Sequence, residues 1–203
     1  MTLLARRDLL LAFAAAMVLP RAARALAAPT WKTLSGPFVQ ERTLGLFKSV
    51  VRSSGKLTLV RPDRLRWELF APDEIVYWAT PDVLAYRSRQ GVGRAPATTG
   101  RVATSMADLR AMLAGDFTGL RARYDVTEGG TESAPTVEAV PKDATKAPFK
   151  KLTLELAPDR IRPVRSTLLE GPKDQTVIRF GDLVLDAPVD PREMEPPKAT
   201  AGH

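Results

Sequence analysis

The sequence predicts a mainly β, single-domain protein in which an antiparallel meander forms either a sandwich or a curved, barrel-like sheet. Two observations predict this class. Apolar and polar residues alternate with a period of two, as in Arg64–Leu69, where Leu65, Trp67 and Leu69 share one face. Short turns rich in Pro and Asp join consecutive alternating segments, and turns this short can connect only antiparallel neighbours.

The expected strands lie in two groups, one in each half of the chain. They are Leu57–Arg61, Arg64–Leu69, Ile75–Ala79 and Val83–Tyr86, followed by Lys151–Leu156, Arg162–Glu170 and Gln175–Phe180. Gly91–Arg101 is rich in Gly, Ala and Thr and is expected to be a mobile loop. Residues 129–147 are expected to form a disordered loop containing one candidate strand, Thr136–Val140, and residues 198–203 a frayed tail.

One segment has helical rather than strand spacing. Ser105 is a candidate N-cap with Asp108 three residues later, and Gly115 supplies a stop. The apolar stripe between them consists of Met106, Leu109, Met112 and Leu113. The stripe suits ordinary core packing, and its flexible thioethers also suit contact with a ligand of variable shape.

Residues 1–27 have the order of a cleavable export signal. A basic part ends at Arg6-Arg7, an apolar run follows from Leu9 to Leu19, and Ala25–Ala27 offers a cleavage site. The apolar run is about half the length that a membrane-spanning helix needs. Both the twin-arginine and the Sec route fit, and either places the mature protein, residues 28–203, in the periplasm.

Composition excludes several classes of function. Without residues 1–27, the formal charge falls from +7 to +4, and the basic residues are dispersed among acidic ones, so we expect no nucleic-acid partner. There is no Cys, which excludes disulfides and a lipid-modified cysteine. The one His is the terminal His203, which excludes His-based zinc sites and Ser–His or Cys–His catalysis.

One set of motifs runs through the whole mature chain: Phe38-x-Gln40, Gly55-Lys56-Leu57, Arg61-Pro62-x-x-Leu65-x-Trp67 and Pro72, with Ile178-x-Phe180, Asp190 and Pro196-Pro197 near the end. This set resembles the pattern of the LolA family of periplasmic outer-membrane lipoprotein carriers. The resemblance implies an incomplete antiparallel β-barrel whose apolar concave face is covered by a helical lid. It also implies that acyl chains occupy the cavity and that Arg61 latches the lid when the cavity is empty.

Spacing along the strands identifies the residues expected to line a cargo cavity. Leu57, Leu59 and Arg61 fall on the same face, and a charged group there needs hydrogen-bond acceptors or must reach the rim. Leu65 also matches a family position linked to receiving cargo from the inner-membrane release complex. The full candidate set is Leu57, Leu59, Leu65, Trp67, Leu69, Met106, Leu109, Met112, Leu113, Leu152, Leu154 and Leu156. A filled core and an open cavity require the same apolar face, so both interpretations stand.

The chain departs from the family pattern at its start. Only Ala28–Pro37 precedes the strand that we expect at the Phe38-x-Gln40 motif, where the family has a long amphipathic helix, and Trp31 and Leu34 allow one helical turn at most. The lid is therefore expected to consist mainly of the Met106–Ala114 helix. This departure leaves room for a related carrier of glycolipid or other acyl compounds.

The resulting hypothesis is a monomeric, non-enzymatic carrier without cofactor or metal. It would take an acylated lipoprotein or lipid from an inner-membrane release complex or exporter to an outer-membrane acceptor. A hydrolase of envelope lipids or glycans is the enzymatic alternative, with Asp73 and Glu74, or Glu155 and Asp159, as carboxylate pairs. An envelope stress sensor that binds lipidated ligands is a third.

Overall fold

The computed structural model describes residues 30–45 and 49–198. The expected export signal, residues 1–27, lies outside the described residues, as do positions 199–203 of the expected tail. Within these ranges no helix is both long and apolar enough to cross a membrane.

Among the described residues, twelve strands form one antiparallel sheet, with two short α-helices and a 3-10 turn. The first six strands are β1 (Thr33–Leu44), β2 (Ser49–Val60), β3 (Arg64–Leu69), β4 (Ile75–Ala79), β5 (Val83–Ser88) and β6 (Gly91–Pro96). The helices α1 (Arg101–Ala114) and α2 (Phe117–Arg123) follow. The remaining elements are β7 (Tyr124–Gly130), β8 (Pro135–Pro141), β9 (Lys151–Leu156), β10 (Pro163–Leu169), β11 (Gln175–Phe180), β12 (Val184–Leu185) and η1 (Pro191–Met194).

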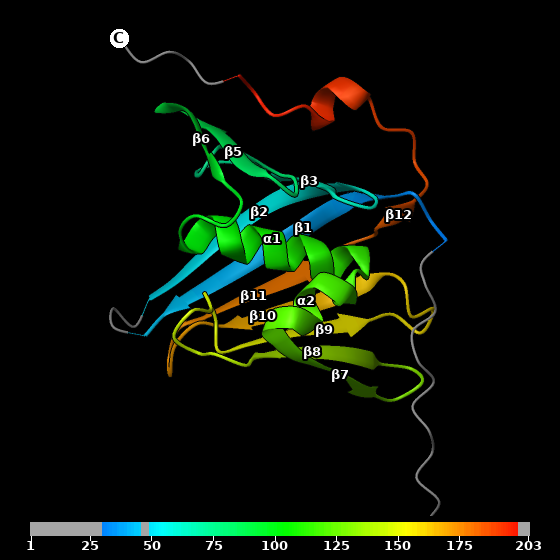
Figure 1. The fold of residues 1–203 in the computed structure, drawn as a ribbon. Coiled ribbons are helices and arrows are strands. Elements are labelled where there is room, and N and C mark those ends of the chain that lie inside the picture. The colour runs from blue at the N-terminus through cyan, green and yellow to red at the C-terminus, as the bar shows by residue number, and fades with distance from the viewer. Residues whose placement is uncertain (1–29, 46–48, 199–203) are drawn as a thin grey trace, which may run out of the picture.

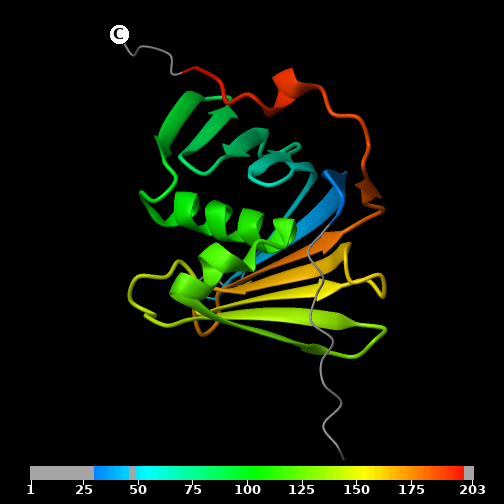
Figure 2. The same cartoon turned by 45° about the vertical axis from the view of Figure 1, so that its right-hand side comes forward.

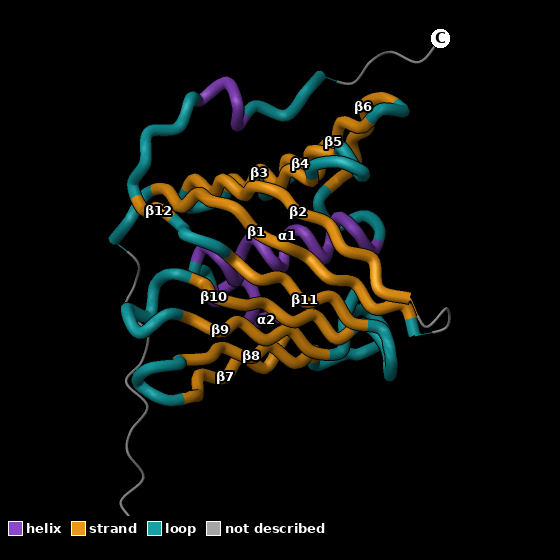
Figure 3. The backbone as a smooth tube through the Cα atoms, turned by 180° about the vertical axis from the view of Figure 1, so that it is seen from behind, coloured by secondary structure: helices purple, strands orange, loops and turns teal. Residues whose placement is uncertain are grey.

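The sheet curls into an incomplete barrel, which confirms the predicted fold class. Its strand order is β6-β5-β4-β3-β2-β1-β11-β10-β9-β8-β7, with β12 added beside β1. The two ends of this path, β6 and β7, are edges and do not pair with each other in the described part of the chain. The two helices lie inside the curl on the concave face (Figures 1 and 2), while the view from behind shows the convex face of the strands (Figure 3).

The long β1–β2 hairpin is the centre of the sheet, and three family motifs meet on it. Register places Phe38 opposite Gly55 and Leu57 opposite Trp67. The Phe38 ring stacks on Trp67 with centroids 3.9 Å apart. A Cβ at Gly55 would lie 2.0 Å from the Glu68 carbonyl oxygen and 2.6 Å from the Phe38 ring, so only glycine fits there. The motifs thus form one packing unit in the core.

The C-terminal segment passes over the outer face of β3 and β4 (Figure 1). Trp78 donates its indole N–H to the carbonyl oxygen of Glu193 at 2.8 Å, and both Trp78 and Met194 are buried. The segment therefore covers an aromatic side chain that would otherwise be exposed on the convex side.

Most of the predicted strands are confirmed, four of them with the same bounds: Arg64–Leu69, Ile75–Ala79, Lys151–Leu156 and Gln175–Phe180. The predicted strand Arg162–Glu170 is one residue too long at each end. The sequence pattern missed the full length of β1 and the short helix α2.

The predicted start of the helix is wrong. Helix α1 begins at Arg101 after Gly100, four residues before the proposed cap Ser105, and the Asp108 side chain is buried instead of capping. Its predicted stop is confirmed, because Gly115 has φ 68° and ψ 20°, the left-handed conformation of a helix C-terminus.

Three irregular segments are also corrected. Gly91–Arg101 is not a loop, since its first six residues form β6 and pair with β5. Residues 129–147 contain the strand β8, paired on both sides, which includes the candidate strand Thr136–Val140. Leu34 belongs to β1 and not to a helical turn. Composition alone assigned these segments to loops, but their backbone N–H and C=O groups form hydrogen bonds with neighbouring strands of the sheet.

Candidate functional site

A cleft opens between the N-terminal half of α1 and the concave face of the sheet. Its volume is about 350 Å³. The apolar lining is Val51, Trp67, Leu69, Ile75, Val102, Met106, Leu109, Leu168 and Ile178. The polar lining is Gln40, Arg42, Ser53, Asp73, Tyr77, Arg101, Ser105, Glu170 and Thr176. The cleft is therefore apolar along its floor and polar along part of its rim.

The candidate apolar residues divide into two groups in the structure. Four of them, Trp67, Leu69, Met106 and Leu109, line the cleft. The other eight, Leu57, Leu59, Leu65, Met112, Leu113, Leu152, Leu154 and Leu156, are at most 6% exposed and belong to the core. Met112 and Leu113, from the C-terminal half of α1, belong to the same core cluster as the six leucines of the sheet and help to fill the space that a deeper cavity would occupy.

Leu65, the candidate for contact with a partner, is placed in the core. It lies opposite Leu59 on β2 and Ala79 on β4, and it is 1% exposed. A partner cannot touch this side chain while α1 covers the sheet.

The rim of the cleft carries an ionic cluster that sequence reasoning missed. Glu170, directly after β10, lies 3.7 Å from Nε of Arg42 on β1 and 3.9 Å from a guanidinium nitrogen of Arg101. The Thr176 hydroxyl donates to the same carboxylate at 3.4 Å. The three charged groups come from positions far apart in the sequence. The register of β1, β10 and β11 brings Arg42 and Glu170 together, and the start of α1 adds Arg101.

The opposite wall of the cleft holds a second polar pair. The Ser53 hydroxyl donates to the Asp73 carboxylate. Tyr77 lies on the same wall, and burial, together with the nearby charge of Asp73, raises the pKa of its phenol. Asp73 and Glu74 were one of the two carboxylate pairs considered for a hydrolase, but Glu74 makes a two-bond ion pair with Arg89. In the other pair, Glu155 binds Arg165 and Asp159 binds Arg162.

Helix α1 is tied to its neighbours by a buried acid. Asp108 is fully buried, and its carboxylate accepts hydrogen bonds from the Tyr124 hydroxyl at 2.5 Å and from Arg123. Burial raises the pKa of this carboxyl, while both partners act in the opposite direction. The contact joins α1 to the junction between α2 and β7.

Arg61 lies at the turn after β2 and reaches the segment that precedes β1. Its guanidinium donates to the carbonyl oxygen of Trp31 at 3.4 Å and lies 5.2 Å from the centre of the Trp31 ring. Its backbone N–H donates to the carbonyl of Lys32. Arg61 thus holds the N-terminal segment, whose Trp31 is 6% exposed and part of the core.

A different arginine ties α1 to the turn beside Arg61. Arg110 donates from its guanidinium to the carbonyl oxygen of Asp63 at 3.1 Å. Burial lowers the pKa of this guanidinium. Arg110 therefore makes the kind of arginine-to-carbonyl contact that a helical lid requires, from the helix side.

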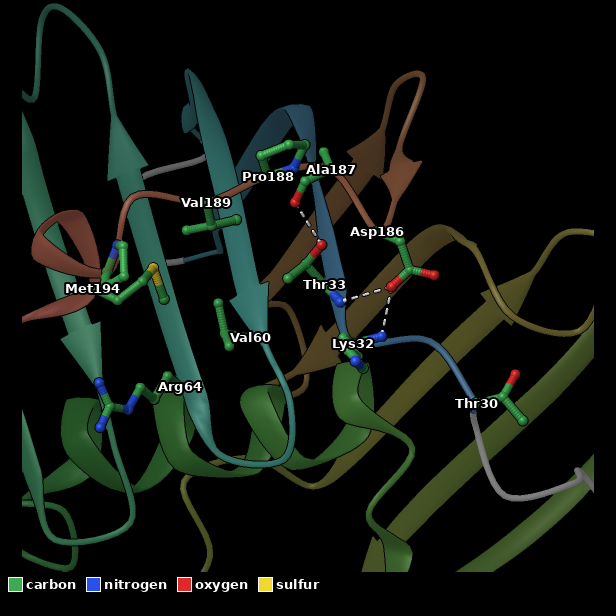
Figure 4. A pocket seen from close by; sticks show the side chains of 11 residues that line it. Thr30, Lys32, Thr33, Val60, Arg64, Asp186, Ala187, Pro188, Val189 and Met194 are labelled. Carbon is green, nitrogen blue, oxygen red and sulfur yellow. Dashed lines mark hydrogen bonds between the residues drawn. The ribbon is translucent and has the colours of Figure 1, made fainter.

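A second pocket, of about 550 Å³, lies on the outside of the sheet (Figure 4). It is bounded by the start of β1, by Val60 and Arg64, and by the C-terminal segment from Asp186 to Met194. Asp186 accepts hydrogen bonds from the backbone N–H groups of Lys32 and Thr33, and the Thr33 hydroxyl donates to the carbonyl of Ala187. These bonds fasten the C-terminal segment, and the pocket does not reach the concave face.

Five apolar cleft residues were missing from the candidate set: Val51, Ile75, Val102, Leu168 and Ile178. For Leu168 and Ile178 the sequence held a usable signal, because the alternation in the predicted strands Arg162–Glu170 and Gln175–Phe180 places them on one face. In the part of the chain that the structure describes, no three His, Cys, Asp or Glu side chains gather as a metal site would require.

Comparison with known proteins found solved structures that are similar to this one. Among solved structures, a LolA superfamily protein from Nitrosomonas europaea is 10% identical with a TM-score of 0.44, over 82% of this chain and 91% of the other. An outer membrane lipoprotein-sorting protein domain from Vibrio parahaemolyticus is 10% identical with a TM-score of 0.45, over 81% and 89%. MucB of Pseudomonas aeruginosa, in complex with MucA, is 18% identical with a TM-score of 0.42, over 84% and 56%.

No curated protein matches the sequence. The family model described as outer membrane lipoprotein carrier protein LolA, however, matches residues 29–194, which include every described strand and helix. The chain therefore belongs to the LolA family of outer membrane lipoprotein carrier proteins.

Proposed function

We propose that the protein is a periplasmic carrier that shields acyl chains of a lipoprotein or related lipid between the concave face of its sheet and helix α1. The observation that carries the proposal is the cleft itself, whose apolar lining comes from five strands and from α1. Family membership supports a carrier rather than an enzyme.

The side chains of the cleft suit an aliphatic ligand. Met106 and Leu109 from α1 face Leu168 and Ile178 from the sheet. Methionine adapts its shape at low cost, and each methylene removed from water contributes about 0.8 kcal/mol to binding. An acyl chain entering at the rim would therefore be stabilised along its length.

The closed form offers limited room. A volume of about 350 Å³ is near the lower end for ligand pockets, which run from about 300 to 1,000 Å³. Moving α1 would expose the leucines beneath its C-terminal half, including Leu57, Leu59 and Leu154, and enlarge the apolar surface. We infer that loading requires α1 to shift, so the eight core leucines become cargo contacts only in an open form.

The carrier cycle would begin and end at partners. Residues 1–27 would direct export by the twin-arginine or Sec route, and residues 28–203 would work as a monomer without a cofactor. An inner-membrane release complex or exporter would supply the cargo, and an outer-membrane acceptor would remove it.

The direct test is to express the full chain with its own residues 1–27, isolate the protein from the periplasm, and record native mass spectra. Protein carrying acyl compounds that dissociate on activation is the expected result. A parallel preparation of Met106→Gln, which puts an amide into the cleft floor, should carry less. Val164→Gln is the matched control, since Val164 is 48% exposed and outside the cleft. A folded wild-type protein that carries no acyl compound and takes up none would overturn the proposal.

A further inference from the structure

We propose that Arg42 and Arg101 form a binding site for an anionic headgroup at the mouth of the cleft, so that the preferred cargo is an acyl chain ending in a carboxylate or phosphate. The inference rests on the proposed acyl-binding function and goes beyond it by naming the charge of the cargo. It stands on the geometry of the rim cluster.

Two guanidinium groups share a single carboxylate at this rim. Arg42 comes from β1 and Arg101 is the first residue of α1, and their side chains are 52% and 60% exposed. Glu170 between them is 16% exposed. Both arginines line the cleft and remain half exposed, so they keep guanidinium donors accessible to a ligand, while Glu170 is the least exposed of the three charged groups.

The contacts with Glu170 are loose. Charge-assisted hydrogen bonds between guanidinium and carboxylate are typically about 2.7–2.9 Å long. The separations here, 3.7 Å and 3.9 Å, are those of ion pairs without direct hydrogen bonds. An incoming oxyanion that makes bidentate bonds to either arginine would therefore gain contacts that Glu170 does not make.

The other acidic side chain of the lining does not neutralise this site. Asp73 follows β3 on the opposite wall, where its carboxylate accepts the Ser53 hydroxyl. Neither Arg42 nor Arg101 pairs with it among the ion pairs of the described residues. The positive character of the rim is thus confined to the edge where α1 begins, and the first turn of α1 contains no acidic residue.

The apolar lining of the cleft begins within about one and a half helical turns of this cation pair. Met106 is five residues after Arg101 on α1, and Leu168 and Ile178 lie on the two strands that carry the Glu170–Thr176 contact. An extended amphiphile would place its head between the two arginines and its chain along Met106 and Leu109. The spacing matches a ligand whose charge is at the end of the acyl chain.

The test compares ligands that differ in headgroup charge but share one acyl chain. Isothermal titration of the mature protein at pH 8 would use palmitate, 1-palmitoyl lysophosphatidic acid and the neutral 1-monopalmitoylglycerol, each below its micelle concentration. Both anions should bind at least about tenfold more tightly than the neutral ligand. The tighter anion shows whether a carboxylate or a phosphate is preferred.

Three substitutions then test whether the preference for anionic ligands arises at this rim. Arg42→Gln and Arg101→Gln should each weaken binding of both anions by about tenfold and leave the neutral ligand unchanged. Glu170→Gln removes the competing charge and should strengthen anion binding by about threefold. Arg165→Gln is the matched control, because Arg165 is an exposed arginine paired with Glu155 at 3.3 Å and outside the cleft.

The outcomes separate this inference from the proposed function. Equal binding of charged and neutral ligands, or losses in Arg42→Gln and Arg101→Gln that are the same for all three ligands, would overturn the anion site and leave the carrier proposal intact. Failure of the folded wild type to bind any of the three ligands would overturn both.

Discussion

Tyr124 donates its phenolic hydrogen to the Asp108 carboxylate at 2.5 Å, in a part of the core where both side chains are at most 2% exposed. Arg123 binds the second carboxylate oxygen from the more exposed side. The pair fixes helix α1, which forms one wall of the cleft, against the junction of α2 and β7. Burial and the Asp108 charge raise the pKa of the Tyr124 phenol, so Tyr124 remains a donor throughout the neutral range.

Removing only this hydroxyl should destabilise the protein measurably. Tyr124→Phe leaves the ring packed on Phe149 but deprives a buried carboxylate of one donor. The free energy of unfolding in urea should fall by about 1–3 kcal/mol. Tyr86→Phe is the control, since Tyr86 is 41% exposed, and its effect should stay within about 0.5 kcal/mol. Equal losses in the two variants would argue against a special role for the buried pair.

The pH dependence of stability should show the raised pKa of Asp108. In the fold the carboxyl holds its proton to higher pH than in the unfolded chain, whose value is near the ordinary 3.8. Between those two pKa values the folded state binds more protons, so the stability of the wild type relative to Asp108→Asn should fall as the pH rises through this window. Urea unfolding of both proteins from pH 3.5 to 7 measures this difference.

Glu41 serves as an internal control, because its contribution to stability should change with pH in the opposite direction to that of Asp108. Hydrogen bonds from Arg52 and Arg179 lower the pKa of the Glu41 carboxyl from 4.5 to about 2. Its contribution is therefore complete above pH 4.5 and is lost as the pH falls towards 2. The stability of the wild type relative to Glu41→Gln should decrease on acidification over that range. If the stability difference from the wild type changed with pH in the same direction for Asp108→Asn and Glu41→Gln, the pKa shifts given for both residues would be contradicted.

The sequence predicted the sheet well because alternation survives wherever one face is buried. In β3, Leu65 and Trp67 are buried and Arg64 is exposed, as the pattern requires. In β1 the alternation of apolar and polar residues fails as a signal, because Gly36 and Pro37 interrupt it. The strand forms nevertheless, since twelve of its positions pair with β2. Register with a partner strand, which a single segment does not encode, determined the length of β1.

The candidate site was predicted less completely, for a related reason. Alternation identified apolar residues on the concave face, but the division between core and cleft depends on where α1 lies, which spacing within one segment does not determine. Asp108 was assigned to a cap because it follows Ser105 by three residues, whereas its partner Tyr124 comes from another element. The Arg42–Glu170–Arg101 cluster joins three segments and left no local pattern in the sequence.

Substitution of a core leucine and a cleft methionine should separate stability from binding. Leu57 is fully buried beneath α1, and Leu57→Ala should lower the free energy of unfolding by about 2–5 kcal/mol. Met106 is partly buried and lines the cleft, so Met106→Ala should cost less stability and weaken binding of 1-monopalmitoylglycerol more. Urea unfolding and titration on the same preparations measure both effects. If Met106→Ala binds like the wild type, the cleft is not the acyl site.

Arg61 and Arg110 provide the last prediction, because they hold two different segments near the same turn. Arg61 contacts Trp31 before β1, whereas Arg110 connects α1 itself to Asp63. If Arg61 is the latch, its contacts stabilise the empty, closed form of the protein. Arg61→Leu removes this stabilisation, so the variant should still load acyl cargo but release it slowly to an acceptor, because closing no longer compensates for the cargo contacts that are lost.

Arg110→Gln, by contrast, should speed acyl entry and increase amide hydrogen exchange across Arg101–Ala114, since it removes a contact of α1 with the sheet. Stopped-flow uptake of a fluorescent fatty acid and exchange measurements on both variants distinguish the two roles. Normal transfer by Arg61→Leu, together with faster entry in Arg110→Gln, would make Arg61 a rim residue and assign the closing contact of the lid to Arg110.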